Sequence, residues 1–560
     1  MNSLSKVLMS ERSRRRLLSQ VAALAGGGSV LAAGNDARAV ARDGLSSSEG
    51  ARAMAAATPL PAAIAAVMEQ PRYAGATWGL LVSDLATGEP LFEHNADRRL
   101  FTASVRKLFS VGLALDRLGA DHRITTPVYR RGDVDGQGTL EGDLILVAAG
   151  DLTLGGRVTA EDEIAYTDFD HNDANGLGTA ILTPQDPLRG LDDLARQVKA
   201  AGIQSVSGEV IVDDRLFEPF IAPNQKLPIT PIMVNENQID VTVTPTTEGT
   251  AAAVTWRPET EAFTLLADVT TSSEGTPATV ARSDSGRITC IGEDGCAGTV
   301  TGEIPVGFQA PLSRRPELIQ TFQIEEPAAF ARTAFIEALQ RAGVEVAAPG
   351  VAANPAGTLP VADAYAPDTQ VAEFVSPPYA EFAKLILKVS LNLGANVSLM
   401  LFGLTQGKRT VNEALAVERE TLIDQVGLVP DSFMFPTNGS GTPDSEATAR
   451  AVVQVLTAMS QTDVAAAYRA ALPILGEDGS LAEAGRDLPG KGHVLAKTGT
   501  TLDASGIKVQ NLAGYIDAKS GRQLAFALLL NDAGPIEGIE DVLAVIEDEA
   551  AITSAIYELG

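Results

Sequence analysis

The stretch Val494-Leu495-Ala496-Lys497-Thr498-Gly499-Thr500 is a short apolar run that ends in a polar segment. Two further apolar runs, 511–516 and 524–530, follow it, and the turn Lys519-Ser520-Gly521-Arg522 separates them. Short apolar runs bounded by turn residues are typical of antiparallel strands. A helical pattern near 539–556 comes after them. The C-terminal part of the chain therefore predicts an antiparallel sheet with a helix packed on it.

The same combination of strands and helices occurs nearer the N-terminus. Two apolar runs, 78–82 and 89–92, predict a β-hairpin. A helix is predicted over 103–119, because apolar residues recur there at helical spacing. Further helices are predicted over 380–404 and 446–459. Helices packed on antiparallel strands make an α+β fold.

The middle of the chain differs in composition from its two ends. Residues 127–360 are rich in Thr, Val, Gly and Asp, and their short strand-like runs are interrupted by one clear helical pattern, 191–202. A chain of 560 residues also exceeds what one hydrophobic core usually serves. We therefore expect residues 59–126 and 361–560 to form one α+β domain, with one or two mostly β domains inserted at 127–360.

Composition narrows the classes of function. The chain carries 43 Lys and Arg against 71 Asp and Glu, a formal net charge of −28. This acidic balance argues against nucleic acid as a partner, because phosphate binding needs clustered cations. It also argues against docking on an anionic membrane surface. Four His and two Cys leave little material for a metal cluster, so we predict no metal and no cofactor.

The first residues read as an export signal. A basic cluster at 12–16 precedes a weakly apolar stretch, and Ala37-Arg38-Ala39 fits a small-x-small cleavage site. The arginines fit both an ordinary secretory signal and a twin-arginine signal, and both alternatives remain open. Residues 1–39 are thus predicted to be removed near Ala39, and 40–58 to form a flexible lead-in. The mature protein is expected to be periplasmic, without a membrane anchor.

Two pairs of residues carry the chemistry. Ser104 and Lys107 lie three positions apart on a predicted helix and so share one face. A neighbouring amine can take the proton of a Ser hydroxyl if burial and other cations depress the pKa of that amine. On the predicted strand, alternation places Lys497 and Gly499 on one face. We expect Lys497 to keep Lys107 neutral, and Gly499 to let a substrate lie against the strand.

A third motif, Ser390-Leu391-Asn392, follows the helical run 381–389. Ser-x-x-Lys, Ser-x-Asn and Lys-Thr-Gly in this order are the signature of β-lactamases and penicillin-binding proteins. The chain most resembles the low-molecular-mass D-alanyl-D-alanine carboxypeptidase/endopeptidase family, in which a large insertion separates the first two motifs. Other matching stretches include Gly150-Asp151-Leu152-Thr153-Leu154, Asn235-Glu236-Asn237, Gly439-Ser440-Gly441 and Asp478-Gly479-Ser480-Leu481.

The resemblance implies a β-lactamase/transpeptidase-like domain that cleaves D-Ala-D-Ala ends of peptidoglycan stem peptides through an acyl-enzyme. β-Lactams would be covalent inhibitors. The implied roles are Ser104 as nucleophile, Lys107 as base, Ser390 as proton shuttle, Asn392 as a hold on the substrate backbone, and Lys497, Thr498 and Thr500 as carboxylate-binding groups. The backbone N–H groups of Ser104 and Thr500 would form the oxyanion hole. Asp213 aligns with a substrate-facing Asp of the inserted domain.

The sequence departs from the family pattern in places. Leu391 replaces the usual Asp of the second motif, and Asn438 stands where Asp is expected. Residues 155–185 form an extra acidic segment, for which a solvated surface loop is favoured over a Ca²⁺ site. Its polar residues include Asp168, Asp170, His171, Asn172 and Asp173.

Three alternatives remain at this stage. Cys290 and Cys296 are expected to pair in a small disulfide loop after export, against two free thiols. A β-lactamase or esterase on the same scaffold, and an inactive cell-wall binding protein, compete with the peptidase. The oligomeric state and the balance of carboxypeptidase and endopeptidase activity are left open.

Overall fold

The computed structural model describes residues 60–560 except 284–286, 289–295 and 363. The predicted export signal, the lead-in and Cys290 lie outside these residues. The described residues contain no helix that is both long and apolar enough to cross a lipid bilayer.

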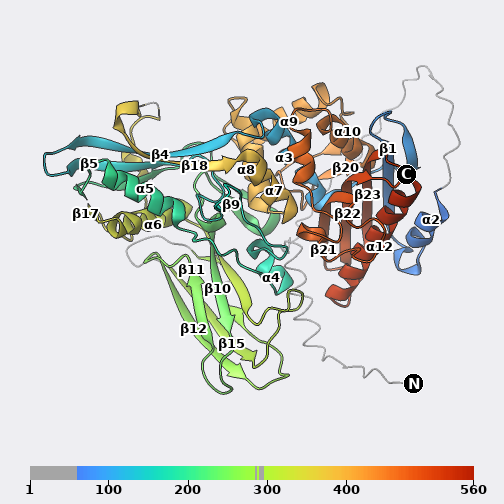
Figure 1. Ribbon diagram of the computed structural model, residues 1–560, viewed down its shortest axis with the longest axis horizontal. Helices are drawn as coiled ribbons and strands as arrows, with labels where there is room; N and C mark the ends of the chain where they lie inside the picture. The colour runs from blue at the N-terminus through green and yellow to red at the C-terminus, as the bar shows by residue number, and fades with distance from the viewer. Residues whose placement is uncertain (1–59, 284–286, 289–295, 363) are drawn as a thin grey trace, which may run out of the picture.

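A five-stranded sheet joins the two ends of the chain, as the sequence predicted (Figure 1). Its strand order is β2-β1-β23-β22-β21, and every neighbouring pair is antiparallel. The N-terminal hairpin therefore pairs with a strand that lies more than four hundred residues later in the sequence. The strands are β1 (Thr77–Asp84), β2 (Pro90–His94), β21 (Val494–Asp503), β22 (Gly506–Asp517) and β23 (Gln523–Gly534).

Helices bury both faces of this sheet, because side chains along each strand alternate between the faces. On β23, Phe526 and Leu528 belong to a core shared with α2 and α12. Ala527 and Leu529 belong to the opposite core, shared with α3 and α10. The result is a three-layer α/β/α arrangement within the α+β class. The helices are α2 (Ala62–Met68), α3 (Lys107–Leu118), α10 (Ala449–Met459) and α12 (Ile539–Leu559).

The predicted helix over 380–404 is two helices, because the chain breaks at Val389-Ser390-Leu391. Ser390 has φ 60, in the left-handed region that a regular helix excludes. The predicted helix over 446–459 begins late for a different reason: 446–448 form a strand, and the Thr448 side chain then caps the helix. The remaining helices here are α7 (Tyr379–Lys388), α8 (Asn392–Leu404), α9 (Val411–Asp424) and α11 (Ala465–Ala470).

The middle of the chain builds a six-stranded sheet of order β17-β6-β5-β4-β18, with β7 paired to β5. Helices α5 (Arg189–Ala200) and α6 (Pro327–Arg341) pack beside it (Figure 1). Its strands are β4 (Arg123–Val134), β5 (Thr139–Val147), β6 (Ser205–Val206), β7 (Val210–Asp213), β17 (Glu345–Val346) and β18 (Gln370–Pro378).

Smaller sheets complete the molecule. One has the order β11-β10-β16-β14 and another β12-β15-β13; both project from the body in Figure 1. Their strands are β10 (Gln238–Thr244), β11 (Ala253–Arg257), β12 (Phe263–Ser272), β13 (Ala281–Arg282), β14 (Arg287–Ile288), β15 (Cys296–Pro305) and β16 (Leu318–Ile324). Two further sheets hold β3 (Arg99–Phe101), β19 (Phe433–Met434) and β20 (Glu446–Thr448), and β8 (Phe220–Ala222) with β9 (Leu227–Ile229).

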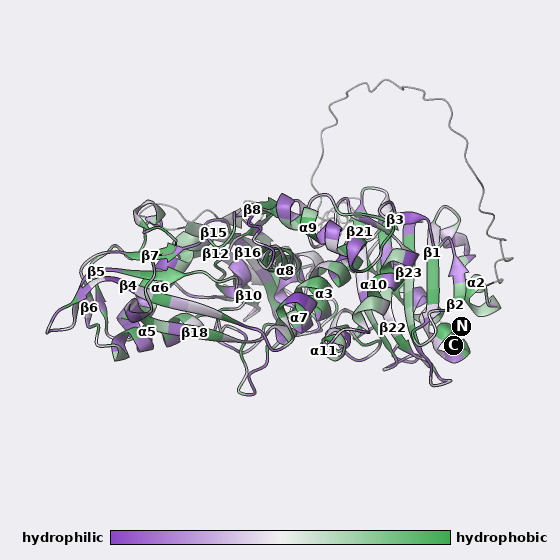
Figure 2. Ribbon diagram, turned by 90° about the horizontal axis from the view of Figure 1, so that it is seen from above, coloured by the Kyte–Doolittle hydropathy of each residue, from purple (hydrophilic) through white to green (hydrophobic). Residues whose placement is uncertain are grey.

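The helices between the two large sheets pack on residues from the middle of the chain. Seen from above, α3, α7 and α8 lie between the β4–β5 sheet and the β1–β23 sheet (Figure 2). The core around Phe382 and Leu387 also contains Leu152, Phe217 and Met233. The middle of the chain thus supplies part of the packing under the catalytic motifs.

Candidate active site

Ser104 lies in a 3₁₀ turn, Ala103–Arg106, that leads directly into α3. The turn begins with Ala103 at φ 44. Gly441 packs so closely that a Cβ there would overlap the Ala103 carbonyl oxygen, and a Cβ on Gly499 would lie 2.7 Å from the Thr102 carbonyl oxygen. Because these two glycines have no side chain, their backbone segments can pack directly against the turn.

This corrects the expectation for Gly499. It was expected to clear room for a substrate, but it lets β21 approach the backbone of the Ser104 turn. The alternation on β21 holds, so Thr498 and Thr500 face the other way and line the cavity. Lys497 shares the side of Gly499 and is fully buried.

The Lys107 amine is the point at which the first two motifs meet. Its Nζ lies 2.6 Å from Ser104 Oγ, 3.2 Å from Ser390 Oγ and 2.7 Å from Asn392 Oδ1. The side chain is completely removed from solvent. The residues predicted from the first and second motifs thus converge on one nitrogen.

The break between α7 and α8 gives the second motif its geometry. Because Ser390 lies in the left-handed region, the chain turns sharply and presents Ser390 and Asn392 to the same amine. Asn392 Nδ2 also donates to Gln225 Oε1 at 3.3 Å. Next to the break, Lys388 pairs with Asp478 at 2.6 Å. The second motif is therefore held by contacts on both sides.

Burial sets the protonation of the two lysines. It lowers the pKa of Lys107 far below its usual value, and the nearby Lys497 lowers it further. Burial also lowers the pKa of Lys497, to about 7. Both effects are opposed by a carboxylate, Asp173. The expectation that a second cation helps to keep Lys107 neutral agrees with this charge arrangement.

Hydrogen bonds link the third motif to buried residues between the sheet and α12. Lys497 Nζ donates to the Thr498 carbonyl oxygen at 2.8 Å. Thr500 Oγ1 donates to Gln510 Oε1 at 2.8 Å, and Gln510 Nε2 donates to Glu549 at 2.9 Å. Burial raises the pKa of Glu549 to about 8, against the effect of Gln510. This chain runs from the cavity wall to α12.

A cavity of about 440 Å³ opens above these groups. Ser104, Ser390, Asn392, Thr498 and Thr500 all line it. Sequence reasoning missed two parts of the wall: acidic residues of the 155–185 segment and an apolar face of α12. These are Asp168, Asp170 and Asp173, and Ile539, Val542, Leu543 and Ile546.

Asp213 does not join this wall. Both of its carboxylate oxygens pair with Arg215, at 2.8 and 2.7 Å, and Tyr365 donates to it as well. It lies at the end of β7 and is buried. Of the two cysteines in the predicted disulfide, Cys296 is disulfide-bonded, and Cys290 lies outside the described residues.

The segment 155–185 is not the solvated loop that its composition suggested. Arg157 pairs with Asp170 at 2.7 Å and with Glu236. His171 lies 2.7 Å from both Glu236 and Asp240, and the second oxygen of Asp240 pairs with Arg257 at 2.9 Å. We call these six residues the Arg157 network: Arg157, Asp170, His171, Glu236, Asp240 and Arg257.

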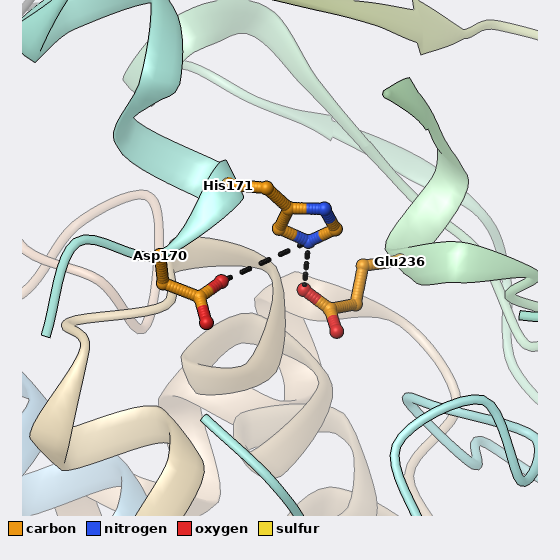
Figure 3. A group of neighbouring side chains, drawn as sticks. All are labelled: Asp170, His171 and Glu236. Atoms are coloured by element: carbon orange, nitrogen blue, oxygen red, sulfur yellow. Dashed lines mark hydrogen bonds and ion pairs between the residues drawn. The ribbon is translucent and has the colours of Figure 1, made fainter. Parts of the chain in front are cut away.

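The donor types in this network also suit a metal ion, since Asp170, His171 and Glu236 offer ligand atoms within 4.8 Å of one another. Figure 3 shows both carboxylates facing the His171 ring. However, the Arg157 guanidinium already donates hydrogen bonds to the carboxylates of Asp170 and Glu236. Both ring nitrogens of His171 also have carboxylate partners. A cation would have to displace a guanidinium, so the residues fit an ion-pair network better than a metal site.

Comparisons with known proteins identify the family of this chain. Residues 60–550 match the D-Ala-D-Ala carboxypeptidase 3 (S13) family. A D-alanyl-D-alanine carboxypeptidase from Actinomadura sp. (strain R39) is 30% identical over 518 residues, covering 87% of this chain and 84% of the relative. The crystal structure of penicillin binding protein 4 from Haemophilus influenzae has a TM-score of 0.64 at 16% identity, over 88% of this chain and 99% of that chain.

A second structure of the Haemophilus influenzae protein, in complex with a β-lactam, has a TM-score of 0.61 at 16% identity, over 88% of this chain and 99% of that chain. These two structures share the fold, and the family match and the Actinomadura relative carry the activity. The chain is a serine-type D-Ala-D-Ala carboxypeptidase and belongs to the D-Ala-D-Ala carboxypeptidase 3 (S13) family.

Proposed function

We propose that Ser104 is the acylated nucleophile and that Lys107 is its general base. The observation that carries this proposal is the position of Lys107 Nζ, in contact with Ser104, Ser390 and Asn392 and shielded from water. A neutral amine has one lone pair and two N–H groups. It can accept the Ser104 proton while donating to Asn392 Oδ1 and Ser390 Oγ, which satisfies all three contacts.

The reaction then takes two steps. Ser104 Oγ gives its proton to Lys107 and attacks the carbonyl carbon of the penultimate D-alanine. The C–N bond breaks, Ser390 passes a proton from Lys107 to the leaving amine, and the terminal D-alanine departs. Water then attacks the carbonyl carbon of the acyl-enzyme and gives a proton to Lys107. The C–Oγ bond breaks, Lys107 returns the proton to Ser104 Oγ, and the shortened peptide departs. Two acyl transfers replace one slow amide hydrolysis.

Substrate binding falls to the third motif. Lys497, partly charged near neutral pH because its pKa is about 7, attracts the terminal carboxylate. Thr498 and Thr500 line the cavity. The Thr498 hydroxyl would donate to the same carboxylate, and the Thr500 hydroxyl, which donates to Gln510 in this structure, would have to turn toward it. The backbone N–H groups of Ser104 and Thr500 would stabilise the developing oxyanion, and Asn392 would hold the peptide backbone. Gly499 fixes the distance between β21 and the nucleophile.

The same site extends to two related reactions. A β-lactam carries a strained amide beside a carboxylate, so it would acylate Ser104 as the substrate does. Cross-linked stem peptides present the same D-alanyl carbonyl, which supports D,D-endopeptidase activity as well.

The signal-like N-terminus supports a periplasmic location. The division into a catalytic domain of 59–126 and 361–560 and an insertion of 127–360 belongs to the same proposal.

A fluorescent penicillin tests the assignment of the nucleophile. Ser104→Ala is expected to abolish covalent labelling, while its urea unfolding curve stays close to that of the unmodified protein. Ser110→Ala is a matched control, since Ser110 lies on α3 and donates to the Gly439 carbonyl oxygen instead of facing Lys107. Label that survives Ser104→Ala would place the nucleophile elsewhere. Label that forms and is rapidly released would indicate a β-lactamase.

Incubation with purified muropeptides, followed by mass analysis, separates the two peptidase activities. Carboxypeptidase action removes one terminal alanine from monomers. Endopeptidase action converts cross-linked dimers to monomers. The absence of both products from a protein that still labels with penicillin would overturn the peptidase proposal for these substrates.

A further inference from the structure

The segment 155–185 is anchored to the inserted sheets by the Arg157 network. His171 and Asp173 bound a 3₁₀ turn. The ring of His171 is held between Glu236 and Asp240, and Asp240 lies on β10. Asp170, directly before the turn, is held by two bonds from Arg157, at 2.7 and 2.8 Å. Buried, multiply bonded side chains fix the turn in one orientation.

The same segment also contacts two residues that lie next to the active site. Asp168 Oδ1 accepts from the backbone N–H of Gly479 at 2.7 Å. Asn172 Nδ2 donates to the Val389 carbonyl oxygen at 3.4 Å, directly before Ser390. The segment is therefore bound to the inserted sheets through Asp170 and His171, and to the active-site side through Asp168 and Asn172.

Asp173 is the residue that this arrangement delivers to the active site. It lines the cavity together with Ser104 and Ser390. The charged groups that act on it electrostatically are Lys107 from α3, Lys497 from β21 and Asp170 from its own segment. Lys107 Nζ contacts Ser104 and Ser390, which line the cavity with Asp173. Burial raises the pKa of Asp173 to about 6, and Lys107 opposes this rise. Asp173 is thus ionised near neutral pH, and it acts on two amines whose pKa values burial has lowered.

We propose that Asp173 is a positioning residue of the acylation site, whose carboxylate sets how many protons Lys107 and Lys497 share. Lys107 must be neutral to act as a base, whereas Lys497 attracts the substrate carboxylate only when it is charged. The Asp173 carboxylate keeps a single proton in the pair. Lys497 is the better holder of that proton, because its Nζ donates to the Thr498 carbonyl oxygen while Lys107 Nζ meets the Ser104 hydroxyl. The three groups titrate together, so their apparent pKa values belong to the set.

The proposal rests on the proposed roles of Ser104 and Lys107, and its test separates the two. The measurement is kcat/KM for an N-acyl peptide ending in D-Ala-D-Ala, from pH 5 to pH 9. Asp173→Asn removes the anion that favours protonation of both lysines. The acid limb of kcat/KM is expected to move to lower pH by at least about 0.5 unit. KM is expected to rise more at pH 7 than at pH 5.5, because Lys497 loses its charge earlier.

Two further variants distinguish charge from structure. Asp173→Glu restores the carboxylate and is expected to move the acid limb back toward its original pH. Asp168→Asn removes a carboxylate from the same cavity wall, but one that does not act on either lysine, so the acid limb is expected to stay in place.

An unmoved acid limb in an Asp173→Asn protein that still labels with penicillin would overturn the proposal. A pH-independent rise in KM for amine-bearing stem peptides alone would assign Asp173 to substrate recognition instead. Asp173→Ser provides a second neutral variant if the amide does not fold. Loss of label in Ser104→Ala concerns only the nucleophile, so the two proposals fail on different measurements.

Discussion

The catalytic lysines and the Arg157 network are both sets of buried ionisable groups, but they differ in how many opposite charges surround them. The network pairs three carboxylates with two guanidinium groups and one imidazole. Although burial opposes its charge, Asp240 and Glu236 raise the pKa of His171 to about 10, so the ring is a third cation. The two lysines instead face one carboxylate. Paired charges hold the fold together, and under-paired amines lose protons and become reactive.

Replacing the proposed base, Lys107, should give the largest effect: a large loss of activity without a loss of stability. Lys107→Met is expected to slow acylation by fluorescent penicillin by about 10²- to 10⁴-fold. Its free energy of unfolding is expected not to fall, because burial already disfavours the charged amine. Acylation rates and urea unfolding at pH 7 measure the two effects. A loss of stability comparable to that of a network variant would show that the amine also supports the fold.

Removing one network cation should have the reverse effect on stability. Arg157→Met leaves Asp170 and Glu236 buried without their main partner, and we expect a loss of about 3–5 kcal/mol. Urea unfolding at pH 7 gives this value. Arg196→Met is the matched control: Arg196 pairs with Asp193 at the surface, with 66% of its side chain exposed, and should lose less than about 1 kcal/mol. Equal losses would refute the distinction between the two regions.

Glu549 offers a test that depends on pH, as a buried carboxyl that accepts a hydrogen bond from Gln510. Its pKa is about 8 in the folded protein against 4.5 in the unfolded chain. The stability that its proton supports is therefore complete below pH 4.5 and is lost as the pH rises to 8. The expected slope is about 1.4 kcal/mol per pH unit. Glu549→Gln should remove this slope.

The difference in unfolding free energy between Glu549→Gln and the unmodified protein, measured from pH 4 to pH 8, isolates this contribution from other groups. The variant should gain stability relative to the parent as the pH rises. A constant difference would mean that Glu549 is ionised in the folded protein.

Local patterns predicted the elements that carry the motifs. Helical spacing placed Ser104 and Lys107 on one face, and strand alternation separated Lys497 and Gly499 from Thr498 and Thr500. Periodicity alone ran one predicted helix through Ser390, because the sequences on both sides are apolar and helical. Only the need for Ser390 and Asn392 to share a pocket pointed to an irregular helix end. A backbone turn that is held by distant contacts leaves little trace in local periodicity.

The acidic segment shows why the rest of the wall was missed. Asp168, Asp170 and Asp173 resemble a solvated stretch when read alone, since acidic side chains are seldom buried without partners. Their environment depends on residues far along the chain. The Gly479 N–H donates to Asp168, and Glu236 and Asp240 pair with Arg157 and His171, the partner and the neighbour of Asp170. Charge pairing across the fold, which periodicity does not report, turns the segment into part of the active site.

The shared core beneath α7 has a consequence for engineering. Leu152, Phe217 and Met233, from the middle of the chain, pack with Phe382 and Leu387. A miniaturised enzyme made by excising residues 127–360 and splicing the ends would leave this hydrophobic surface uncovered and the support of the active-site wall missing. The middle of the chain and the helices of the active site share one hydrophobic core. Truncation libraries should therefore retain residues 127–360.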